Sequence, residues 1–297
     1  MRTLTELDGE TRVVGVIGWP VKHSLSPAMQ NAAIDALGLN WAYVPFEVSP
    51  TRLEGAIESV RALNLVGLNV TVPHKAGVAR LVDELGETAQ ALGAVNTVRN
   101  QDGTLIGHNT DGEGFLRSLR EIGEDVGGKR VAIIGAGGSA RAVALAVARD
   151  EVGDLQVINR TVSRAAEVAR LVRDLTPAPA GALALDSPAA EDAVRQANIV
   201  IDCTPCGMHP NVDEPPAIPE EWIQEGQTVC DLVYTPRETT LLRAARRRNA
   251  RTLDGSGMLV YQGAIALELW TRQAAPVQVM RDALLKALES RECRAAG

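Results

Sequence analysis

The sequence predicts an α/β protein of two domains, in which mainly parallel strands alternate with helices. The chain has 297 residues, which is long for one compact domain and comfortable for two. Short apolar runs alternate with segments of helical periodicity, an order that is typical of parallel sheets. Aromatic residues are scarce, with four Trp, three Tyr and two Phe, so Ala, Val and Leu must fill the core, as suits helices packed on parallel strands.

The first domain begins with an alternation of strand and helix. A helix is expected over 26–37, with Ser26 as its N-cap, Pro27 at its first position and Gly38 as its stop. A second helix is expected over 53–63. Apolar runs predict three strands, over 13–18, 41–48 and 67–72. This alternation indicates a mainly parallel sheet.

A second α/β domain is expected from about 112 to 255, where a new alternation follows the Gly127-Gly128 break. Apolar runs predict four strands in it, over 130–134, 155–158, 197–202 and 228–233. Helical segments are expected up to Arg149, over 163–175 and, in the tail, over 262–270 and from Pro276 onward.

The composition of the chain indicates which kinds of partner it can bind and in which compartment it is expected. The formal net charge of −7 makes nucleic acid and anionic membrane surfaces poor partners. No run approaches the roughly 20 apolar residues of a membrane-spanning helix, and the first residues lack a signal-peptide pattern, so a cytoplasmic location is expected. The four cysteines lack the second pair or the His tract of a zinc set, so no metal site is expected; they stand at 203, 206, 230 and 293.

A Gly-rich segment follows the strand predicted over 130–134 and precedes a helix. It has the pattern G-x-G-x-x-A, which is typical of a dinucleotide-binding turn. The first Gly permits the tight turn, the second lets the backbone approach a pyrophosphate, and the small third residue lets the helix pack closely on the sheet. The candidate residues are Gly135, Ala136, Gly137, Gly138, Ser139 and Ala140.

The end of the next predicted strand indicates which dinucleotide binds. An NAD site would place Asp or Glu there to accept from the ribose hydroxyls. The chain instead has Asn159, Arg160 and Thr161, followed by Arg164. Two guanidinium groups would pair with a 2′-phosphate, which a carboxylate would repel. We therefore expect NADP, although the same two arginines would also suit an ordinary exposed surface.

Polar residues gather in four segments near the ends of strands in the first domain. Ligands of open α/β sheets bind beyond the carboxyl ends of the strands, so these segments predict a pocket for a small polar molecule. They are His-Ser-Leu-Ser-Pro at 23–27, Asn-Val-Thr-Val-Pro-His-Lys at 69–75, Gly-Ala-Val-Asn-Thr at 93–97 and Gly-His-Asn-Thr-Asp-Gly at 107–112.

These segments resemble the motifs of the shikimate dehydrogenase family, and the resemblance extends through 204–208, 231–236 and 255–262 to cover nearly the whole chain. It implies reversible, NADPH-dependent reduction of 3-dehydroshikimate to shikimate in the biosynthesis of chorismate and the aromatic amino acids. It also implies a substrate-binding domain formed by 1–111 and 256–297, onto which the last helices pack back, and a Rossmann-type NADP-binding domain at 112–255.

The resemblance assigns Lys75 and Asp111 to the reacting carbonyl. An ammonium group can polarise a carbonyl, stabilise the developing alkoxide and deliver a proton, and a nearby carboxylate keeps it charged. From the residues alone, Lys75 would be a surface lysine and Asp111 a helix start, and which of the two holds the transferred proton stays open. The resemblance also implies substrate contacts for Ser24, Ser26, Asn69, Thr71, Lys75, Asn96, Asp111, Tyr234 and Gln262, and cofactor contacts for Thr204, Met208 and Gly257.

Two departures from the family pattern leave substrate breadth open. Trp19 stands where a polar residue is common, and Gln30 replaces a His. The alternatives are a quinate/shikimate dehydrogenase that prefers NAD, another two-domain NADP enzyme such as a folate dehydrogenase, and a non-catalytic NADP-binding module. A homodimer is also left open.

Overall fold

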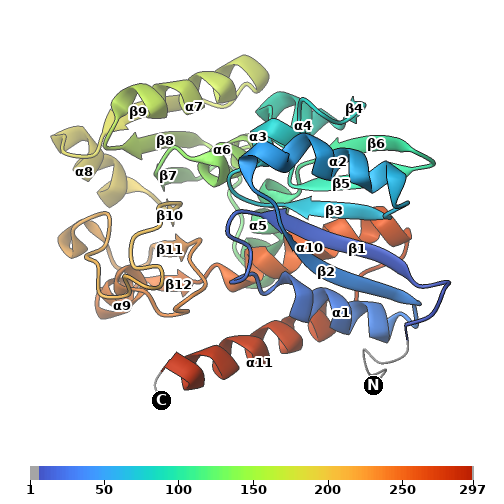
Figure 1. The fold of residues 1–297 in the computed structure, drawn as a ribbon. Helices are drawn as coiled ribbons and strands as arrows, with labels where there is room; N and C mark the ends of the chain where they lie inside the picture. Colours follow the sequence, from blue (N-terminus) through green and yellow to red (C-terminus); the bar gives the residue numbers. More distant parts are fainter. Residues whose placement is uncertain (1–6, 296–297) are drawn as a thin grey trace. The chain divides into compact units, whose positions relative to one another are not determined.

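The computed structural model describes residues 7–295, which fold into two compact units (Figure 1). One unit joins Met1–Thr110 with Val260–Gly297, and the other comprises Asp111–Leu259. The chain therefore leaves the first unit once and returns to it once. Within the described residues, no helix combines the length and the apolar character that crossing a membrane requires.

The first unit contains a six-stranded mixed sheet. Its strands are β1 (Arg12–Gly18), β2 (Trp41–Glu47), β3 (Gly67–Val70), β4 (Glu84–Leu85), β5 (Thr97–Gln101) and β6 (Thr104–His108), in the order β2-β1-β3-β5-β6-β4. β1 is parallel to β2 and β3, whereas β5 is antiparallel to β3 and β6. The expected parallel pairing is thus confirmed for three strands. β5 and β6 differ because Asp102-Gly103, both with positive φ, joins them in a tight hairpin.

Helices cover both faces of this sheet (Figure 1). One face carries the short helix η1 (Pro50–Arg52), α2 (Leu53–Ala62), α3 (Lys75–Val78) and α4 (Glu87–Leu92). The other carries α1 (Ser26–Ala36), α10 (Ser256–Thr271) and α11 (Val277–Ala295). Trp270 of α10 donates from Nε1 to the Val98 carbonyl at 2.9 Å, and α11 buries Met280, Leu284 and Leu288. The expected return of the last helices to the first unit is therefore confirmed.

Several element boundaries differ from the expectation by a few residues, and three of these differences have a clear local description. α1 begins at Ser26 itself, with Leu25 as the N-cap residue and no side-chain cap, so the assignment of Ser26 as N-cap is wrong. β3 ends at Val70, since the chain then turns and the His74 N–H bonds back to the Thr71 carbonyl at 3.0 Å. α10 begins at Ser256, ahead of the expected Gln262, because Asp254 accepts from the Ser256 N–H and opens the helix there.

The second unit contains a six-stranded sheet in which every strand pairing is parallel. Its strands are β7 (Arg130–Ile134), β8 (Asp154–Asn159), β9 (Ala180–Ala184), β10 (Ile199–Asp202), β11 (Thr228–Asp231) and β12 (Arg251–Leu253), in the order β12-β11-β10-β7-β8-β9. This is the doubly wound order of a Rossmann-type domain, with its reversal between β7 and β10. The expected fold is confirmed. β9 was missed because Ala-Gly-Ala-Leu-Ala has weak strand propensity.

Helices also cover both faces of the second sheet (Figure 1). α5 (Asp111–Glu121), α6 (Gly138–Arg149) and α7 (Val162–Leu175) pack on one face, where Phe115, Val143 and Val168 share a buried cluster. α8 (Pro188–Gln196), η2 (Glu220–Trp222) and α9 (Thr240–Arg247) pack on the other. The carboxyl ends of all six strands therefore open at one edge of the sheet, where the expected cofactor residues stand.

Candidate functional site

Lys75 stands just beyond the carboxyl end of β3, as the first residue of α3. The residue before it is anchored, because His74 is buried and its Nε2 donates to the Val48 carbonyl at 2.7 Å. The Lys75 carbonyl in turn accepts from the Val95 N–H at 2.9 Å. The backbone at Lys75 is thus fixed from two sides. Sequence analysis did not single out His74, whose only signal was its place between Pro73 and Lys75.

A buried hydrogen-bond network ties Asn69 to its neighbours in the first unit. The Tyr43 hydroxyl donates to Asn69 Oδ1 at 2.8 Å, and Asn69 Nδ2 donates to Thr97 Oγ1 at 3.1 Å and to the Asn96 carbonyl at 3.3 Å. Burial raises the pKa of Tyr43 well above its usual range, against the opposing effect of a hydrogen bond with Ser26. The phenol therefore stays neutral and serves as a donor. Tyr43 was expected only as a strand residue.

Thr110 joins two predicted substrate-binding residues. Asn96 Nδ2 donates to Thr110 Oγ1 at 2.9 Å, and the Thr110 N–H donates to Asn96 Oδ1 at 2.9 Å. Thr110 Oγ1 then donates to the Gln262 carbonyl at 3.0 Å. Segments that are far apart in the chain, near 96, 110 and 262, therefore meet in the first unit. Thr110 stood in the sequence motif at 107–112, but its chemistry did not mark it out as the residue that connects these segments.

Ser24 and Ser26 lie at the amino-terminal end of α1, after the carboxyl end of β1. Ser24 Oγ accepts from the Ser26 N–H at 3.3 Å, and Ser26 is buried. Arg291 of α11 donates to the carbonyls of His23 and Ser24, at 2.5 and 3.3 Å. The first turn of α1 contains no acidic residue. The positive end of the helix dipole and the two hydroxyls suit a carboxylate ligand.

Thr71 and the two departures from the family pattern lie in the same unit. The Thr71 N–H donates to the Ile17 carbonyl at 3.0 Å, and a Cβ on Gly18 would lie 2.5 Å from Thr71 Cγ2. Trp19 is 46% exposed, so its ring is free to contact a ligand. Gln30 is fully buried and donates to the Gly263 carbonyl at 2.9 Å, beside Gln262. Gln30 is therefore tied to α10 next to Gln262, whereas the Trp19 N–H donates to the Val72 carbonyl at 3.1 Å.

Asp111 is the first residue of α5 and belongs to the second unit. It is buried in the first turn of that helix. Its backbone continues directly from Thr110, which the network of Asn96 and Gln262 fixes. The pairing of Asp111 with Lys75 stays a prediction.

The Gly-rich turn has the geometry of an anion-binding loop. Gly135 follows β7 with φ of +100°, in the region that favours glycine, and a Cβ there would lie 3.3 Å from the Cys203 carbonyl carbon. α6 begins at Gly138 with Gly137 as its N-cap residue, and a Cβ at either glycine would meet open space. Ala140 is fully buried. The free N–H groups at the start of α6 can therefore receive a pyrophosphate.

The end of β8 presents the two expected arginines. β8 ends at Asn159, whose Nδ2 donates to the Thr161 carbonyl at 2.9 Å and shapes the turn into α7. Arg160 and Arg164 are both exposed, and neither has an ion pair with any residue that the structure describes. Their charges are thus available to a phosphate, which fits a 2′-phosphate group at this place.

The remaining predicted residues follow β10, β11 and β12. Thr204 donates its N–H to Asp202 Oδ1 at 2.7 Å, and Met208 is 46% exposed. Tyr234 lies in the loop after β11. Gly257 lies in the first turn of α10, where a Cβ would come within 2.9 Å of Ser118 Cβ on α5. The second unit therefore gathers the predicted cofactor residues at the carboxyl ends of its strands, and the first unit contains most of the predicted substrate residues.

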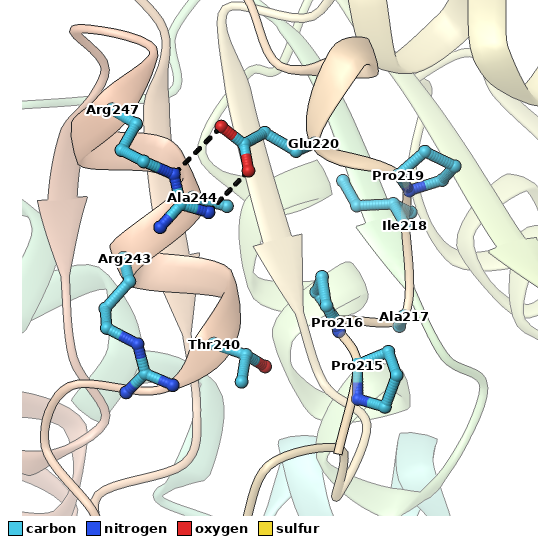
Figure 2. Close-up of a pocket in the computed structure, with 10 residues that line it drawn as sticks. All are labelled: Pro215, Pro216, Ala217, Ile218, Pro219, Glu220, Thr240, Arg243, Ala244 and Arg247. Atoms are coloured by element: carbon cyan, nitrogen blue, oxygen red, sulfur yellow. Dashed lines mark hydrogen bonds and ion pairs between the residues drawn. The ribbon is translucent and has the colours of Figure 1, made fainter. Parts of the chain in front are cut away.

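Two cavities of the second unit lie apart from these residues. One has a volume of about 650 Å³ and lies between the proline-rich segment 215–219 and α9, where Figure 2 shows Glu220 paired with Arg247. The other, of about 220 Å³, is lined by Arg130, Asp154 and Gln196, near the amino ends of the strands. No predicted site residue lines either cavity. Neither lies where ligands of doubly wound sheets bind.

The cysteines behave as isolated thiols in the described part of the chain. Cys203, Cys206 and Cys230 form no disulfide, and the side chain of Cys293 lies outside the described residues. Burial raises the pKa of the Cys203 and Cys230 thiols, which keeps them protonated. Among the residues that the structure describes, no group of three or more His, Cys, Asp or Glu side chains could hold a metal ion.

Comparisons with known proteins agree along the chain. Family models match the shikimate dehydrogenase substrate binding domain at residues 16–98, shikimate / quinate 5-dehydrogenase at 117–212 and the shikimate 5′-dehydrogenase C-terminal domain at 255–285. A relative from Methanopyrus kandleri, named shikimate dehydrogenase (NADP(+)), is 50% identical over 97% of this chain and 100% of its own.

Solved structures give the same result. A crystal structure of a shikimate dehydrogenase in complex with NADP+ has a TM-score of 0.89 at 40% identity, and covers 95% of this chain and 97% of its own. The shikimate 5-dehydrogenase from Listeria monocytogenes, in complex with shikimate and NAD, has a TM-score of 0.89 at 36% identity, and covers 94% of this chain and 98% of its own. Identity, coverage and fold together show that the chain belongs to the shikimate dehydrogenase family.

Proposed function

We propose that the protein catalyses the reversible, NADPH-dependent reduction of 3-dehydroshikimate to shikimate, a step in the biosynthesis of chorismate and the aromatic amino acids. The observation that carries this proposal is 50% identity to an NADP-dependent shikimate dehydrogenase over 97% of the chain. The anchored Lys75 segment, the buried Asn69 and Asn96 network and the open Gly-rich turn support it, because each supplies a group that the reaction needs.

Lys75 and Asp111 are the proposed catalytic residues. When bound, NADPH supplies the hydride that reduces the carbonyl carbon. The Lys75 ammonium polarises the carbonyl oxygen, and a proton reaches that oxygen as the alkoxide develops. Asp111 orients the Lys75 ammonium.

The polar residues of the first unit are proposed to recognise the substrate. Ser24 and Ser26 would hold its carboxylate at the start of α1. The substrate hydroxyls would form hydrogen bonds with Asn69, Thr71, Asn96, Asp111 and Gln262. Tyr234 would also contact the substrate. A buried site built for hydroxyls rejects analogues that lack them, because its own polar atoms are then left unpaired.

The cofactor is proposed to be NADP. Its pyrophosphate would lie on residues 135–140 and its 2′-phosphate against Arg160 and Arg164, with Asn159 and Thr161 shaping that turn. Thr204, Met208 and Gly257 would border the nicotinamide.

The proposal includes a cytoplasmic location and no nucleic-acid or membrane partner, in keeping with the net charge of −7. Sedimentation analysis distinguishes a monomer from a homodimer.

The test is turnover with four substrate and cofactor pairs. Purified protein is mixed with shikimate or quinate, each with NADP+ or NAD+, and reduction of the nicotinamide is followed at about 340 nm, where the reduced ring absorbs. Fast turnover with shikimate and NADP+ alone is the expected result. Comparable rates with quinate would show a broader substrate range, in which the exposed Trp19 is the first residue to examine. Comparable rates with NAD+ would contradict the role of the two arginines, and no turnover with any pair would contradict the proposed reaction.

A further inference from the structure

Three neighbouring strands of the second unit have an aspartate at the carboxyl end: Asp202 is the last residue of β10, Asp231 is the last residue of β11, and Asp254 directly follows β12. We call these residues the strand-end aspartates. Each accepts, through one carboxylate oxygen, the backbone N–H two residues further on. The donors are Thr204 at 2.7 Å, Val233 at 2.9 Å and Ser256 at 2.9 Å. The same aspartate-stabilised turn therefore opens three adjacent loops.

These loops carry residues that the proposed function uses. Thr204 and Met208 lie in the 203–211 loop, and Tyr234 lies in the 232–239 loop. The loops are also bonded to one another. The His209 N–H donates to the Thr235 carbonyl at 2.9 Å, and the Gly255 N–H donates to the Val233 carbonyl at 3.1 Å. A displacement of one loop is therefore transmitted to the next.

Asp202 and Asp231 differ from Asp254 in their charge environment. Asp254 pairs with Arg237 at 3.0 Å. Asp202 and Asp231 are each 1% exposed, and neither has a Lys or Arg partner among the described residues. They are register partners on parallel strands, so their side chains lie on one face of the sheet at the usual strand spacing of about 4.8 Å. Two negative charges at these positions would repel each other strongly in the dry interior.

The surroundings favour one shared proton on this pair. Burial, and then the charge of Asp231, raises the pKa of Asp202 to about 7. Burial raises the pKa of Asp231 to about 6, although it accepts from the Thr239 hydroxyl at 2.6 Å and from the Val233 N–H. Each aspartate receives a side-chain hydrogen bond, Asp202 from Thr204 and Asp231 from Thr239, but the pKa of Asp202 is raised further, so the proton is expected on Asp202.

The other groups that face the pair supply no compensating charge. β12 contributes Asp254, whose charge Arg237 offsets. The adjoining thiols of Cys203 and Cys230 stay protonated because burial raises the pKa of each. On the other side, Asp202 is the register partner of Ile134 in β7. The adjacent end of α9 presents Thr239, a neutral hydroxyl that also caps the helix.

We propose that Asp202 and Asp231 act together as positioning residues, which hold the 203–211 and 232–239 loops in the shape that receives the nicotinamide part of the cofactor. This inference rests on the proposed function. With one proton on the pair, both turns are held without repulsion. Loss of that proton sets two negative charges side by side and displaces the bonded loops, so the affinity for NADPH should fall as the pH rises through neutrality.

The test is the pH dependence of NADPH binding, measured by cofactor fluorescence without any turnover. Wild type, Asp202→Asn and Asp231→Asn are compared from pH 6 to pH 8, because asparagine keeps an acceptor oxygen for the turn and cannot ionise. Asp186→Asn is the matched control, since Asp186 is an exposed aspartate that follows β9 in the same unit. The cofactor phosphate itself titrates near a pH of about 6. Its contribution cancels in the ratio of wild-type to variant Kd at each pH.

We expect the ratio of wild-type Kd to Asp202→Asn Kd to rise roughly three- to tenfold between pH 6 and pH 8. This change is smaller than the effect that two close like charges can have on each other's pKa. Asp186→Asn should follow wild type throughout. Parallel profiles for wild type and Asp202→Asn would overturn the inference and leave the proposed function standing. Absence of NADPH binding to wild type at every pH would overturn both. If Asp231→Asn does not fold, Asp202→Asn decides the question alone.

Discussion

Lys75 is the residue whose replacement should separate chemistry from binding. Its backbone is anchored through His74 and Val95, so removing the side chain leaves the segment in place. Lys75→Ala is expected to lower kcat by roughly 10²–10⁴, the usual effect of losing a positioned proton donor. The KM for shikimate should change much less. Steady-state kinetics with shikimate and NADP+ measure both constants.

Lys22→Ala is the control for this change, because Lys22 is an exposed lysine whose side chain is 86% accessible. It should leave kcat where it was. An unchanged kcat in Lys75→Ala would remove Lys75 from the chemistry.

Arg160 and Arg164 should govern the choice between the two cofactors. Each is exposed and without an ion pair among the described residues, so each can bond to a 2′-phosphate. Replacing either by Ala is expected to lower kcat/KM for NADP+ about tenfold or more, because a hydrogen bond to a charged group contributes roughly 1.5–3 kcal/mol. The value for NAD+ should stay nearly constant. Arg170→Ala is the control, because Arg170 is an exposed arginine on the same helix as Arg164. Equal losses with both cofactors would contradict the proposed role of the two arginines.

Single residues also show which features could be predicted from the sequence and which could not. The place of Arg160 and Arg164 could be predicted because a strand end and a short motif define it locally. Tyr43 and Thr110 could not, because their roles depend on bonds to residues distant in the chain, from 43 to 69 and from 110 to 262. The N-cap assigned to Ser26 failed because the helix begins one residue earlier than the capping pattern implies.

Among the elements, α11 is the one whose packing can be tested most directly. Leu284 is fully buried in the face that α11 turns toward the first unit. Leu284→Ala should destabilise the protein by about 2–5 kcal/mol, since it removes buried carbon atoms and leaves a cavity. Denaturant unfolding measures the free-energy change. Leu63→Ala is the control, because Leu63 is 69% exposed and its loss should have little effect. A small effect at Leu284 would mean that α11 is loosely held.

Sequence patterns missed β9 and the antiparallel pair β5 and β6 for different physical reasons. β9 has small side chains and no buried residue, so it depends on pairing with β8 rather than on its own propensity. β5 and β6 form a hairpin whose Asp-Gly signal was present, yet the surrounding alternation favoured a parallel sheet. The spacing of Met280, Leu284 and Leu288 did indicate a buried helix face, but periodicity alone cannot say which surface covers it.

For the molecule as a whole, the buried pair Asp202 and Asp231 should make stability depend on pH. The pKa of Asp202 is raised to about 7 in the folded state, above its ordinary value of 3.8. Between these two values the unfolded chain has lost a proton that the folded protein keeps, so stability falls as the pH rises through this window and then levels off.

Asp202→Asn removes the contribution of Asp202 to this dependence, so its Tm relative to wild type is expected to rise from pH 5 to pH 8. Calorimetry at several pH values measures the difference, and Asp186→Asn should show no such trend. A constant difference between Asp202→Asn and wild type would mean that Asp202 ionises as freely in the folded protein as in the unfolded chain.

The return of the chain to its first unit has a consequence for synthesis on the ribosome. β1, β2 and β3 emerge early, but the helices α10 and α11 that cover one face of their sheet emerge only after residues 111–259. At a translation rate of about 5–20 residues per second, that face of the sheet stays uncovered for roughly 7–30 s before α10 and α11 are synthesised. The second unit can meanwhile complete its own parallel sheet. Chaperone binding should therefore matter most for the nascent first unit, in the interval before α10 and α11 are synthesised, although this unit is the first part of the protein to be translated.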